Sequence, residues 1–251
     1  MSDLQVLELL ENTKGRDFTV GDIHGCFDRL DEALAAANFN PQTDRLISVG
    51  DLVNRGAHSI RCLEYLQQPW FYAVAGNHED MVIENIRDDG SLFFGDVDKH
   101  MKWLRGLDND TRKLIKAAFQ VLPTAIQVET KEGPMAFVHA NIPPGMDWPS
   151  FREKLEAGDH KTQKSAKWSR KRIKGNFNEQ VAGISRVYFG HTKMVSGARK
   201  LGNCFYIDTG AVYGERAGNA KKGFMTLIDI TAPARKIARK PLFKKSTRLV
   251  C

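Results

Sequence analysis

Five short motifs place Asp, Asn or His directly after a run of apolar residues. They are GDIHG at 21–25, GDLVNRG at 50–56, GNHE at 76–79, FVHAN at 137–141 and FGHT at 189–192. In α/β proteins, ligands collect beyond the carboxyl ends of strands, so polar side chains that follow several strands are expected to meet in one crevice. A single Asp after Gly is more often a turn former, but five such motifs in one chain indicate a shared site.

The side chains in these motifs are oxygen and imidazole ligands for metal ions. No thiolate is among them, and this set suits Mn, Fe, Zn or Mg better than it suits a cysteine-rich structural zinc site. The candidates exceed the three or four protein ligands of a typical single site, so two ions that share one carboxylate fit better. The candidate ligands are Asp22, His24, Asp51, Asn77, His139 and His191.

A pair of such ions indicates hydrolysis of a phosphate ester. Two metals about 3.5–4 Å apart hold a bridging hydroxide and support both sides of an in-line displacement at phosphorus. The phosphate oxygens also need fixed cations, and Arg55 lies in the GDLVNRG turn, where its guanidinium could make a bidentate contact. Glycines such as Gly50 and Gly76 permit the tight turns that this arrangement requires.

The elements that must position these motifs alternate along the early part of the chain. Apolar runs of strand length, such as FTVGD and LISVGD, alternate with segments whose apolar residues recur three or four positions apart. These helical segments are 27–37, 59–68, 79–89 and 111–122. Strand candidates become shorter and more frequent from about Pro123 to Ile230, so we expect an α/β protein with a mixed or two-sheet core.

Composition indicates one soluble globular domain. The chain has 251 residues, 42% hydrophobic and 27% charged, and no run approaches the roughly 20 apolar residues of a membrane span. Its beginning carries acids where a signal peptide would carry bases, which predicts a cytoplasmic location. We assign 1–232 to the domain and 233–251 to a basic, solvated tail. Free thiols are expected at the widely spaced cysteines, which are Cys26, Cys62, Cys204 and Cys251.

The motifs, in this order, resemble the metal-dependent phosphoprotein phosphatases within the calcineurin-like metallophosphoesterases. The most similar type is the bacteriophage lambda serine/threonine phosphatase, and the similarity continues through KWSRKRI and FYIDTGAVYG to cover most of residues 18–230. This resemblance implies a central β-sandwich flanked by helices, with two metal ions at the strand ends. Mn is the metal most often associated with such bacterial and phage enzymes.

The resemblance also implies a role for each matching residue. One metal would be held by Asp22 and His24, Asp51 would bridge both, and the second metal would be held by Asn77, His139 and His191. A hydroxide that bridges the metals would attack the phosphorus of a phosphomonoester. The substrates implied are phosphoserine and phosphothreonine in proteins, with phosphotyrosine as a further one.

Three more residues have implied catalytic roles. His78, the histidine of GNHE, would act as general acid toward the leaving alkoxide, and Arg55 and Arg170 would grip the phosphate oxygens. Asn54 departs from the family's pattern, which usually reads GDxVDRG, with an acid that stabilises the protonated histidine. An Asn oxygen can accept an imidazole N–H but brings no negative charge, so His78 is expected to lose its proton more easily.

Asn54 leaves a second substrate class open. Symmetrical dinucleoside tetraphosphatases share this scaffold, often lack that acid, and cleave a phosphoanhydride whose leaving group needs less help from an acid. Two features favour a protein or phosphomonoester phosphatase: Glu79, where those enzymes more often have Asp, and the TGAVYG run.

The net charge of +7 predicts attraction to anions. Segment 161–174 could line an open cleft with Lys and Arg, although a solvated charged face explains these residues equally well, Arg170 excepted. A nucleic-acid-binding protein with a residual metal site is the least favoured interpretation, because the chain has no signature of a DNA- or RNA-binding module. The sequence does not indicate an oligomeric state.

Overall fold

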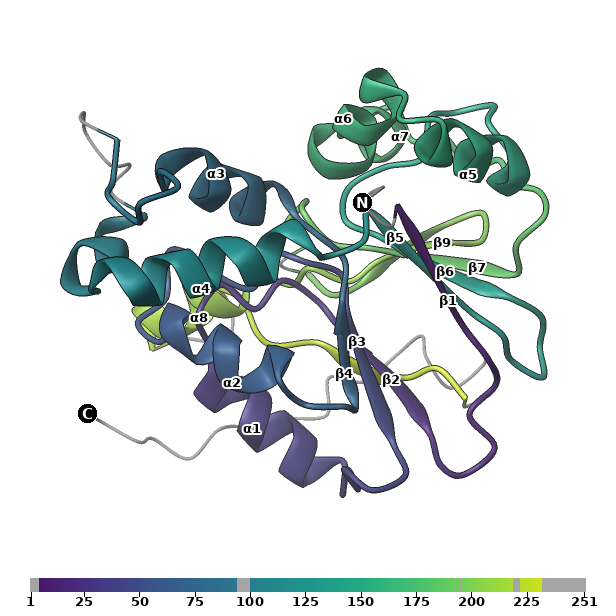
Figure 1. Cartoon of the computed structure of the whole chain (residues 1–251). Helices are drawn as coiled ribbons and strands as arrows, with labels where there is room; N and C mark the ends of the chain where they lie inside the picture. The colour runs from purple at the N-terminus through teal and green to yellow at the C-terminus, as the bar shows by residue number, and fades with distance from the viewer. Residues whose placement is uncertain (1–4, 94–99, 195, 219–221, 232–251) are drawn as a thin grey trace.

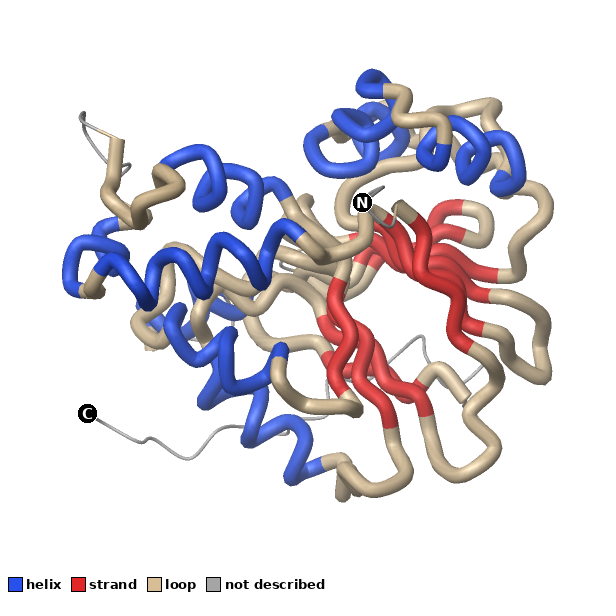
Figure 2. The backbone as a smooth tube through the Cα atoms, viewed as in Figure 1, coloured by secondary structure: helices blue, strands red, loops and turns tan. Residues whose placement is uncertain are grey.

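Two β-sheets lie face to face at the centre of the molecule, and helices cover the outer side of each (Figures 1 and 2). This computed structural model describes residues 5–93, 100–194, 196–218 and 222–231. The tail assigned to 233–251 lies outside the described residues. In the described part of the chain, no helix is long and apolar enough to cross a membrane.

The smaller sheet has four strands in the order β10-β2-β3-β4. Strands β2, β3 and β4 are parallel, and β10 runs antiparallel to β2. Their bounds are Asp17–Val20 for β2, Arg45–Ser48 for β3, Phe71–Ala73 for β4 and Leu227–Asp229 for β10. All four residues of β2 are buried, as expected for a parallel strand covered on both faces.

The larger sheet has six strands in the order β1-β5-β6-β7-β9-β8. Strands β6, β7 and β9 are parallel to one another, whereas β5 and β8 pair antiparallel with β6 and β9. The bounds are Val6–Leu9 for β1, Ala125–Val128 for β5, Met135–Val138 for β6, Arg186–Phe189 for β7, Arg199–Leu201 for β8 and Cys204–Tyr206 for β9. The predicted mixed, two-sheet α/β core is confirmed.

The helices form two groups, one on each sheet (Figure 1). The smaller sheet carries α1 (Phe27–Ala36), α2 (Cys62–Leu66), α3 (Asn77–Asn85) and α4 (Asn109–Gln120), with short 3-10 helices η1 (Ser59–Arg61) and η2 (Lys102–Gly106). The larger sheet carries α5 (Trp148–Glu156), α6 (His160–Trp168) and α7 (Lys171–Lys174). Helix α8 (Ala211–Ala217) follows β9.

Aspartate caps define where three of these helices begin. The side chains of Asp108, Asp147 and Asp159 each accept the backbone N–H three residues later, at the starts of α4, α5 and α6. Such a bond satisfies one of the backbone donors that a helix leaves free at its N-terminus.

Three apolar clusters hold the layers together. One lies between the sheets and includes Ile47 of β3 and Val74, just after β4, with Phe137 and Tyr188 from the larger sheet. A second joins the smaller sheet to α1–α4, and a third joins the larger sheet to α5–α7. The free thiols predicted at Cys26, Cys62 and Cys204 are confirmed, and all three are buried; Cys251 lies outside the described residues.

The four predicted helices are present, but α3 begins at Asn77 rather than at Glu79. Asn77 and His78 therefore lie in the first turn of a helix instead of at a strand end. Helices α5, α6 and α7 were not predicted. For α6 and α7, the charged residues of segment 161–174 favoured a cleft lining or a solvated surface over a packed helical layer.

Candidate metal centre

The polar residues that follow the parallel strands of both sheets meet at one edge of the sandwich. Asp22 follows β2, Asp51 follows β3, His139 follows β6 and His191 follows β7. Asn77 opens α3 just beyond β4. The structure thus brings together side chains from five separate elements, as the strand-end argument predicts.

Asp51 lies at the centre of these residues and faces two groups of imidazoles. One group is His24, Asp51 and His78, and the other is Asp51, His139 and His191; in each, the potential ligand atoms lie within 4.8 Å of one another. Asp51 Oδ2 is 3.6 Å from His24 Nε2, and Asp51 Oδ1 is 3.3 Å from His139 Nε2. Each carboxylate oxygen therefore faces a different group.

Backbone carbonyls fix the protonation site of three imidazoles. His24 Nδ1 lies 3.0 Å from the Val53 oxygen, His139 Nδ1 lies 2.7 Å from the Val49 oxygen, and His191 Nε2 lies 3.0 Å from the Trp168 oxygen. A carbonyl only accepts, so each of these nitrogens carries the proton. The other ring nitrogen keeps its lone pair, and this is the form that ligates metals.

The donor set fits a cation. The lone pair of His139 Nε2 lies 3.0 Å from Asn77 Oδ1 and 3.3 Å from Asp51 Oδ1, so three acceptors converge without a donor between them. All three residues are buried. Buried acceptors that face one another are unfavourable unless a positive charge lies between them, and a divalent ion supplies that charge.

Burial sets the charge state of this centre in the absence of ions. It raises the pKa of Asp51 to about 7 and lowers the pKa of His139 to about 4 and of His191 to about 3. The pKa of Asp22 is also raised, by burial first and then by the neighbouring carboxylates of Asp208 and Asp51. The imidazoles are therefore neutral at neutral pH and available to a metal.

Several residues of the centre have left-handed backbone conformations. The φ angle is 47° at His24, 53° at Asp51, 72° at both Asn54 and Arg55, and 64° at His191. Such conformations cost roughly 1–3 kcal/mol for a residue with a side chain, and they collect at functional sites, where surrounding structure maintains them. The tight turns aim these side chains into the centre.

Comparison with known proteins agrees with this geometry. Residues 19–194 match the family model of the calcineurin-like phosphoesterases. The chain belongs to this family. The phosphoesterase is 34% identical to serine/threonine-protein phosphatase 1 of Salmonella typhimurium over 206 residues, which cover 78% of this chain and 87% of the relative. It is 31% identical to serine/threonine-protein phosphatase 2 of Escherichia coli over 198 residues, covering 77% of this chain and 87% of the relative.

Two further relatives bear on the fold and on the alternative substrate. The symmetrical bis(5'-nucleosyl)-tetraphosphatase of Methylococcus capsulatus is 30% identical over 159 residues, or 58% of this chain and 49% of the relative. A solved serine/threonine phosphatase structure from Saccharomyces cerevisiae superposes with a TM-score of 0.58 at 15% identity, covering 91% of this chain and 78% of that chain. The predicted fold of the phosphoesterase is thus confirmed.

The sequence argument missed the role of Glu79 in the phosphoesterase. Its carboxylate is fully buried and accepts backbone N–H groups from Gly76, Asp51 and Leu52. From the sequence, Glu79 only distinguishes protein phosphatases from the tetraphosphatases, which more often have Asp at this position. Gly76 is a local partner at the start of α3, but no local pattern shows that the other two, Asp51 and Leu52, come from a turn that lies 27–28 residues earlier.

Asp208 was missed as well, although a sequence signal for it exists. It follows β9 in FYIDTG, is buried, and accepts the Gly210 N–H at 2.8 Å. Together with burial, which is the larger cause, its charge raises the pKa of Asp22. The strand-end rule that selected Asp22 applies equally to Asp208.

Both predicted phosphate-binding arginines lie at the centre of the phosphoesterase. Arg55 Nη1 is 2.5 Å from His24 Nε2, and the exposed Arg170 has Nη2 3.5 Å from the His191 oxygen. Lys193 adds a cation that was not predicted, with Nζ 3.9 Å from the centre of the Tyr213 ring; Arg55 Cζ is 6.0 Å from the same ring.

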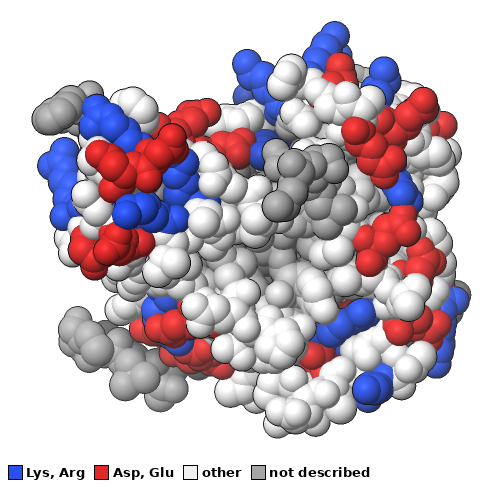
Figure 3. Space-filling model, viewed as in Figure 1, with Lys and Arg blue, Asp and Glu red and all other residues white. Residues whose placement is uncertain are grey.

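Segment 161–174 is only partly available to a substrate. Arg172 is fully buried and donates to the backbone oxygens of Ile142 and Glu179, and Lys167 pairs with Asp80 at 2.8 Å. These two cations therefore stabilise the fold. On the face shown in Figure 3, basic and acidic side chains are interspersed, so the excess positive charge does not form a single patch there.

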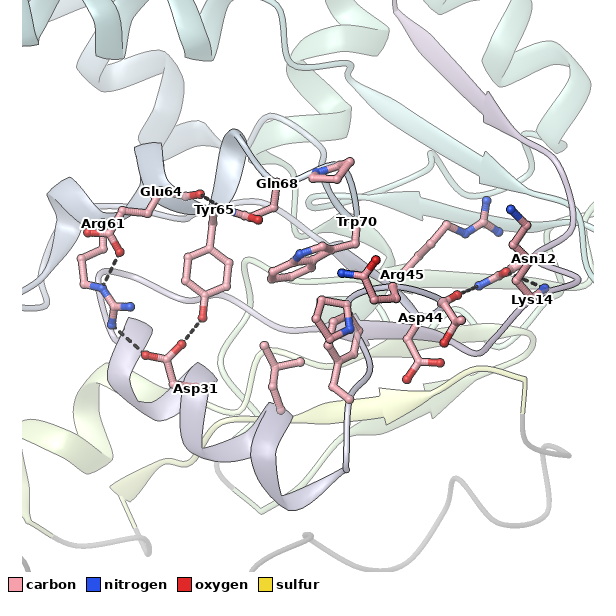
Figure 4. A pocket seen from close by; sticks show the side chains of 16 residues that line it. Asn12, Lys14, Asp31, Asp44, Arg45, Arg61, Glu64, Tyr65, Gln68 and Trp70 are labelled. Carbon is pink, nitrogen blue, oxygen red and sulfur yellow. Dashed lines mark hydrogen bonds and ion pairs between the residues drawn. The ribbon is translucent and has the colours of Figure 1, made fainter.

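A cavity of about 830 Å³ lies elsewhere, next to Arg45 and Trp70, where β3 and β4 begin (Figure 4). The centre lies beyond the opposite ends of these strands. Asp31 in this cavity is already paired, because it accepts from the Tyr65 hydroxyl and from Arg61. The converging acceptors of the metal centre, and not the residues of this cavity, are suited to hold a cation.

Proposed function

We propose that this phosphoesterase is a metal-dependent protein phosphatase that hydrolyses phosphoserine and phosphothreonine. The main support is that one buried carboxylate, Asp51, is shared by two groups of imidazoles, an arrangement suited to two ions. The two serine/threonine phosphatase relatives, which align with more than three quarters of the chain, support the substrate class.

We assign the metal ligands as the sequence predicts. The first ion would be held by Asp22, His24 and the bridging Asp51, and the second by Asp51, Asn77, His139 and His191. Mn is the proposed metal, with Fe, Zn and Mg as alternatives that the same oxygen and nitrogen donors could hold. When bound, the two ions would activate water and neutralise charge on the phosphoryl group.

The remaining residues bind and orient the substrate in this proposal. Arg55 and Arg170 would bind phosphate oxygens, because their guanidinium groups lie beside His24 and His191. His78 would interact with the leaving-group oxygen, because its Nε2 lies on the same side as Asp51 Oδ2, 3.9 Å away. Phosphotyrosine would enter the same site.

A second candidate substrate is a symmetrical dinucleoside tetraphosphate. The absence of a charge at Asn54 favours it, because a nucleotide leaving group needs little protonation. A relative named symmetrical bis(5'-nucleosyl)-tetraphosphatase from Actinobacillus pleuropneumoniae is 47% identical, but over only 64 residues or 25% of this chain. The serine/threonine phosphatases align over much more of the chain and are therefore favoured.

A direct comparison of substrates tests the proposal. The Mn-loaded protein would be assayed in parallel with phosphoserine, phosphothreonine and phosphotyrosine peptides and with diadenosine tetraphosphate. We expect phosphate release from the phosphopeptides, and its loss in His139→Ala. Rapid cleavage of the dinucleotide with inert phosphopeptides would overturn the assignment, and salt-sensitive binding to duplex DNA without any hydrolysis would support a nucleic-acid-binding role instead.

A further inference from the structure

The side-chain amide of Asn54 is held between two aromatic residues. Its Oδ1 accepts from the indole Nε1 of Trp103 at 2.7 Å, and its Nδ2 lies 2.9 Å from Nδ1 of His78. Asn54 is fully buried, and its own N–H is bound to the Ser59 hydroxyl. Trp103 lies in η2 and belongs to none of the motifs that identify the site.

The chemistry of these groups allows only one orientation of the amide. An indole N–H can donate but not accept, so it must face the amide oxygen. The NH₂ group of Asn54 then faces His78, and because NH₂ only donates, Nδ1 of His78 must be the acceptor. A neutral imidazole has one ring proton, and here it is left on Nε2.

This Nε2–H belongs to the metal centre. His78 Nε2 lies 3.9 Å from Asp51 Oδ2, and the His78 ring packs edge-on against His24 with 4.7 Å between ring centres. The His78 backbone N–H donates to Asp51 Oδ1 at 3.0 Å, which fixes the position of the backbone from which the imidazole side chain extends. The proton is therefore held on the side of the ring where a phosphoryl group would lie.

We propose that Trp103 is a positioning residue that, through the Asn54 amide, makes His78 present an N–H from Nε2 to the leaving-group oxygen. The proposal rests on the proposed phosphatase function for the identity of that oxygen. In this arrangement His78 is a neutral hydrogen-bond donor, whereas an acid at position 54 would instead accept from Nδ1–H and support an imidazolium. Substrates whose leaving oxygen needs only a hydrogen bond, such as aryl phosphates, are favoured over alkyl phosphates.

Trp103→Phe tests the proposal, because it removes the indole N–H and keeps an aromatic ring. The amide is then free to turn its oxygen toward His78, which moves the ring proton to Nδ1. The first readout is ¹⁵N NMR of the histidine ring nitrogens in the Zn-loaded protein, with His78 assigned by comparison with His78→Gln. We expect protonated Nε2 in the wild type and protonated Nδ1, or exchange between the two forms, in Trp103→Phe.

The second readout compares turnover of p-nitrophenyl phosphate with that of phenyl phosphate, whose leaving group is the stronger base. In Trp103→Phe, kcat for phenyl phosphate should fall about tenfold and kcat for p-nitrophenyl phosphate about twofold or less, with both KM values unchanged. The matched control is Trp70→Phe. It also replaces an indole by a phenyl ring, but just before β4, at the end of that strand away from the metal centre, so the ratio of the two kcat values should not change.

A double-mutant cycle separates positioning from general destabilisation. In an Asn54→Asp background, one carboxylate oxygen can accept from His78 Nδ1–H whether or not the indole is present, so Trp103→Phe should no longer change the rate ratio. The proposal would be overturned if Trp103→Phe left the His78 tautomer unchanged. It would also be overturned if Trp103→Phe lowered kcat equally for both substrates in the wild-type and the Asn54→Asp backgrounds. The NMR measurement does not depend on activity. If the protein hydrolysed no phosphomonoester, the proposed function would be refuted, but the assigned His78 tautomer would not.

Discussion

Glu79 holds Asp51 in place through the backbone. Glu79 Oε2 accepts the N–H of Asp51 at 2.9 Å and of Gly76 at 2.8 Å, and Oε1 accepts the N–H of Leu52 at 2.8 Å. Asp51 in turn accepts the N–H of His78 through Oδ1 at 3.0 Å. The turn after β3 and the first turn of α3 are thereby joined. The position of Asp51, the bridging ligand in our proposal, therefore depends on a residue that holds no metal in that proposal.

Glu79→Gln should weaken metal binding. A glutamine has one accepting oxygen, so its NH₂ would face a backbone N–H of this turn and leave that buried donor without a partner. The expected loss is about 1–3 kcal/mol in the free energy of unfolding and about 10–100-fold in metal affinity, since the support of a ligand is removed. Urea unfolding and calorimetric titration with Mn measure the two effects.

The matched control for this change is Glu84→Gln, in an exposed position of the same helix. It should change metal affinity by less than about twofold, because surface substitutions are usually near neutral. Equal effects of the two variants would show that the charge on α3, and not the hydrogen bonds from Glu79 to the turn after β3, determines the metal affinity.

Gly190→Ala should displace Asp22. A Cβ at this position would overlap Asp22 Oδ1 and lie 2.8 Å from Cγ2 of Val49, so the carboxylate must move. We expect metal affinity to fall at least tenfold, with a parallel loss of phosphate release at limiting Mn. Gly106→Ala is the control, because a Cβ there meets no atom within 4 Å; a Gly190 variant that binds Mn as tightly as this control would contradict the tight packing around Asp22.

Stability of the metal-free protein should depend on His139 in acid. Burial lowers the pKa of His139 from 6.5 to about 4, so between these values the unfolded chain binds a proton that the folded protein excludes. This contribution to stability is complete above pH 6.5 and is lost as the pH falls toward 4, by about 3 kcal/mol at pH 4. His78 and His191, with pKa values of about 3, act in the same direction.

Urea unfolding at several pH values, in the presence of a chelator, measures this effect. Buried carboxylates with raised pKa values, such as Asp51 and Glu79, act in the opposite direction, so the comparison with His139→Gln isolates the histidine. Between pH 6.5 and 4, the free energy of unfolding should fall by about 3 kcal/mol less in His139→Gln than in the wild type. The control is His160→Gln, an exposed position, whose free energy of unfolding should follow that of the wild type. A His139→Gln curve parallel to the wild type would refute the prediction.

Removal of metal should lower the unfolding temperature and abolish phosphate release. An ion at 100 times its dissociation constant stabilises the folded state by about 2.7 kcal/mol, which corresponds to roughly 5–10 °C for a chain of this size. A thermal scan against Mn concentration tests this, and His139→Ala, which lacks one of the converging acceptors, should show a smaller rise. An unfolding temperature independent of Mn in the wild type would contradict the assigned centre.

The sequence by itself determined which residues gather at the metal centre. Asp22, Asp51, His139 and His191 follow short apolar runs, and the carboxyl ends of parallel strands meet at one edge whatever the details of packing. The core helices α1, α2 and α4 were predictable for a similar reason, since apolar spacing is local. Helices α5–α7 were not, because their charged surfaces hide a packed face that only the larger sheet completes.

Tertiary structure alone decided how those residues are held. The indole that orients Asn54 lies 49 residues away from it, and the backbone N–H that binds Asp22 lies 169 residues away, at His191. Left-handed turns at His24 and Asp51 likewise depend on partners from other elements. Short motifs indicate which side chains are candidates for metal binding and catalysis. Proton positions, carboxylate orientation and backbone strain, in contrast, arise from contacts between segments that are distant in the chain.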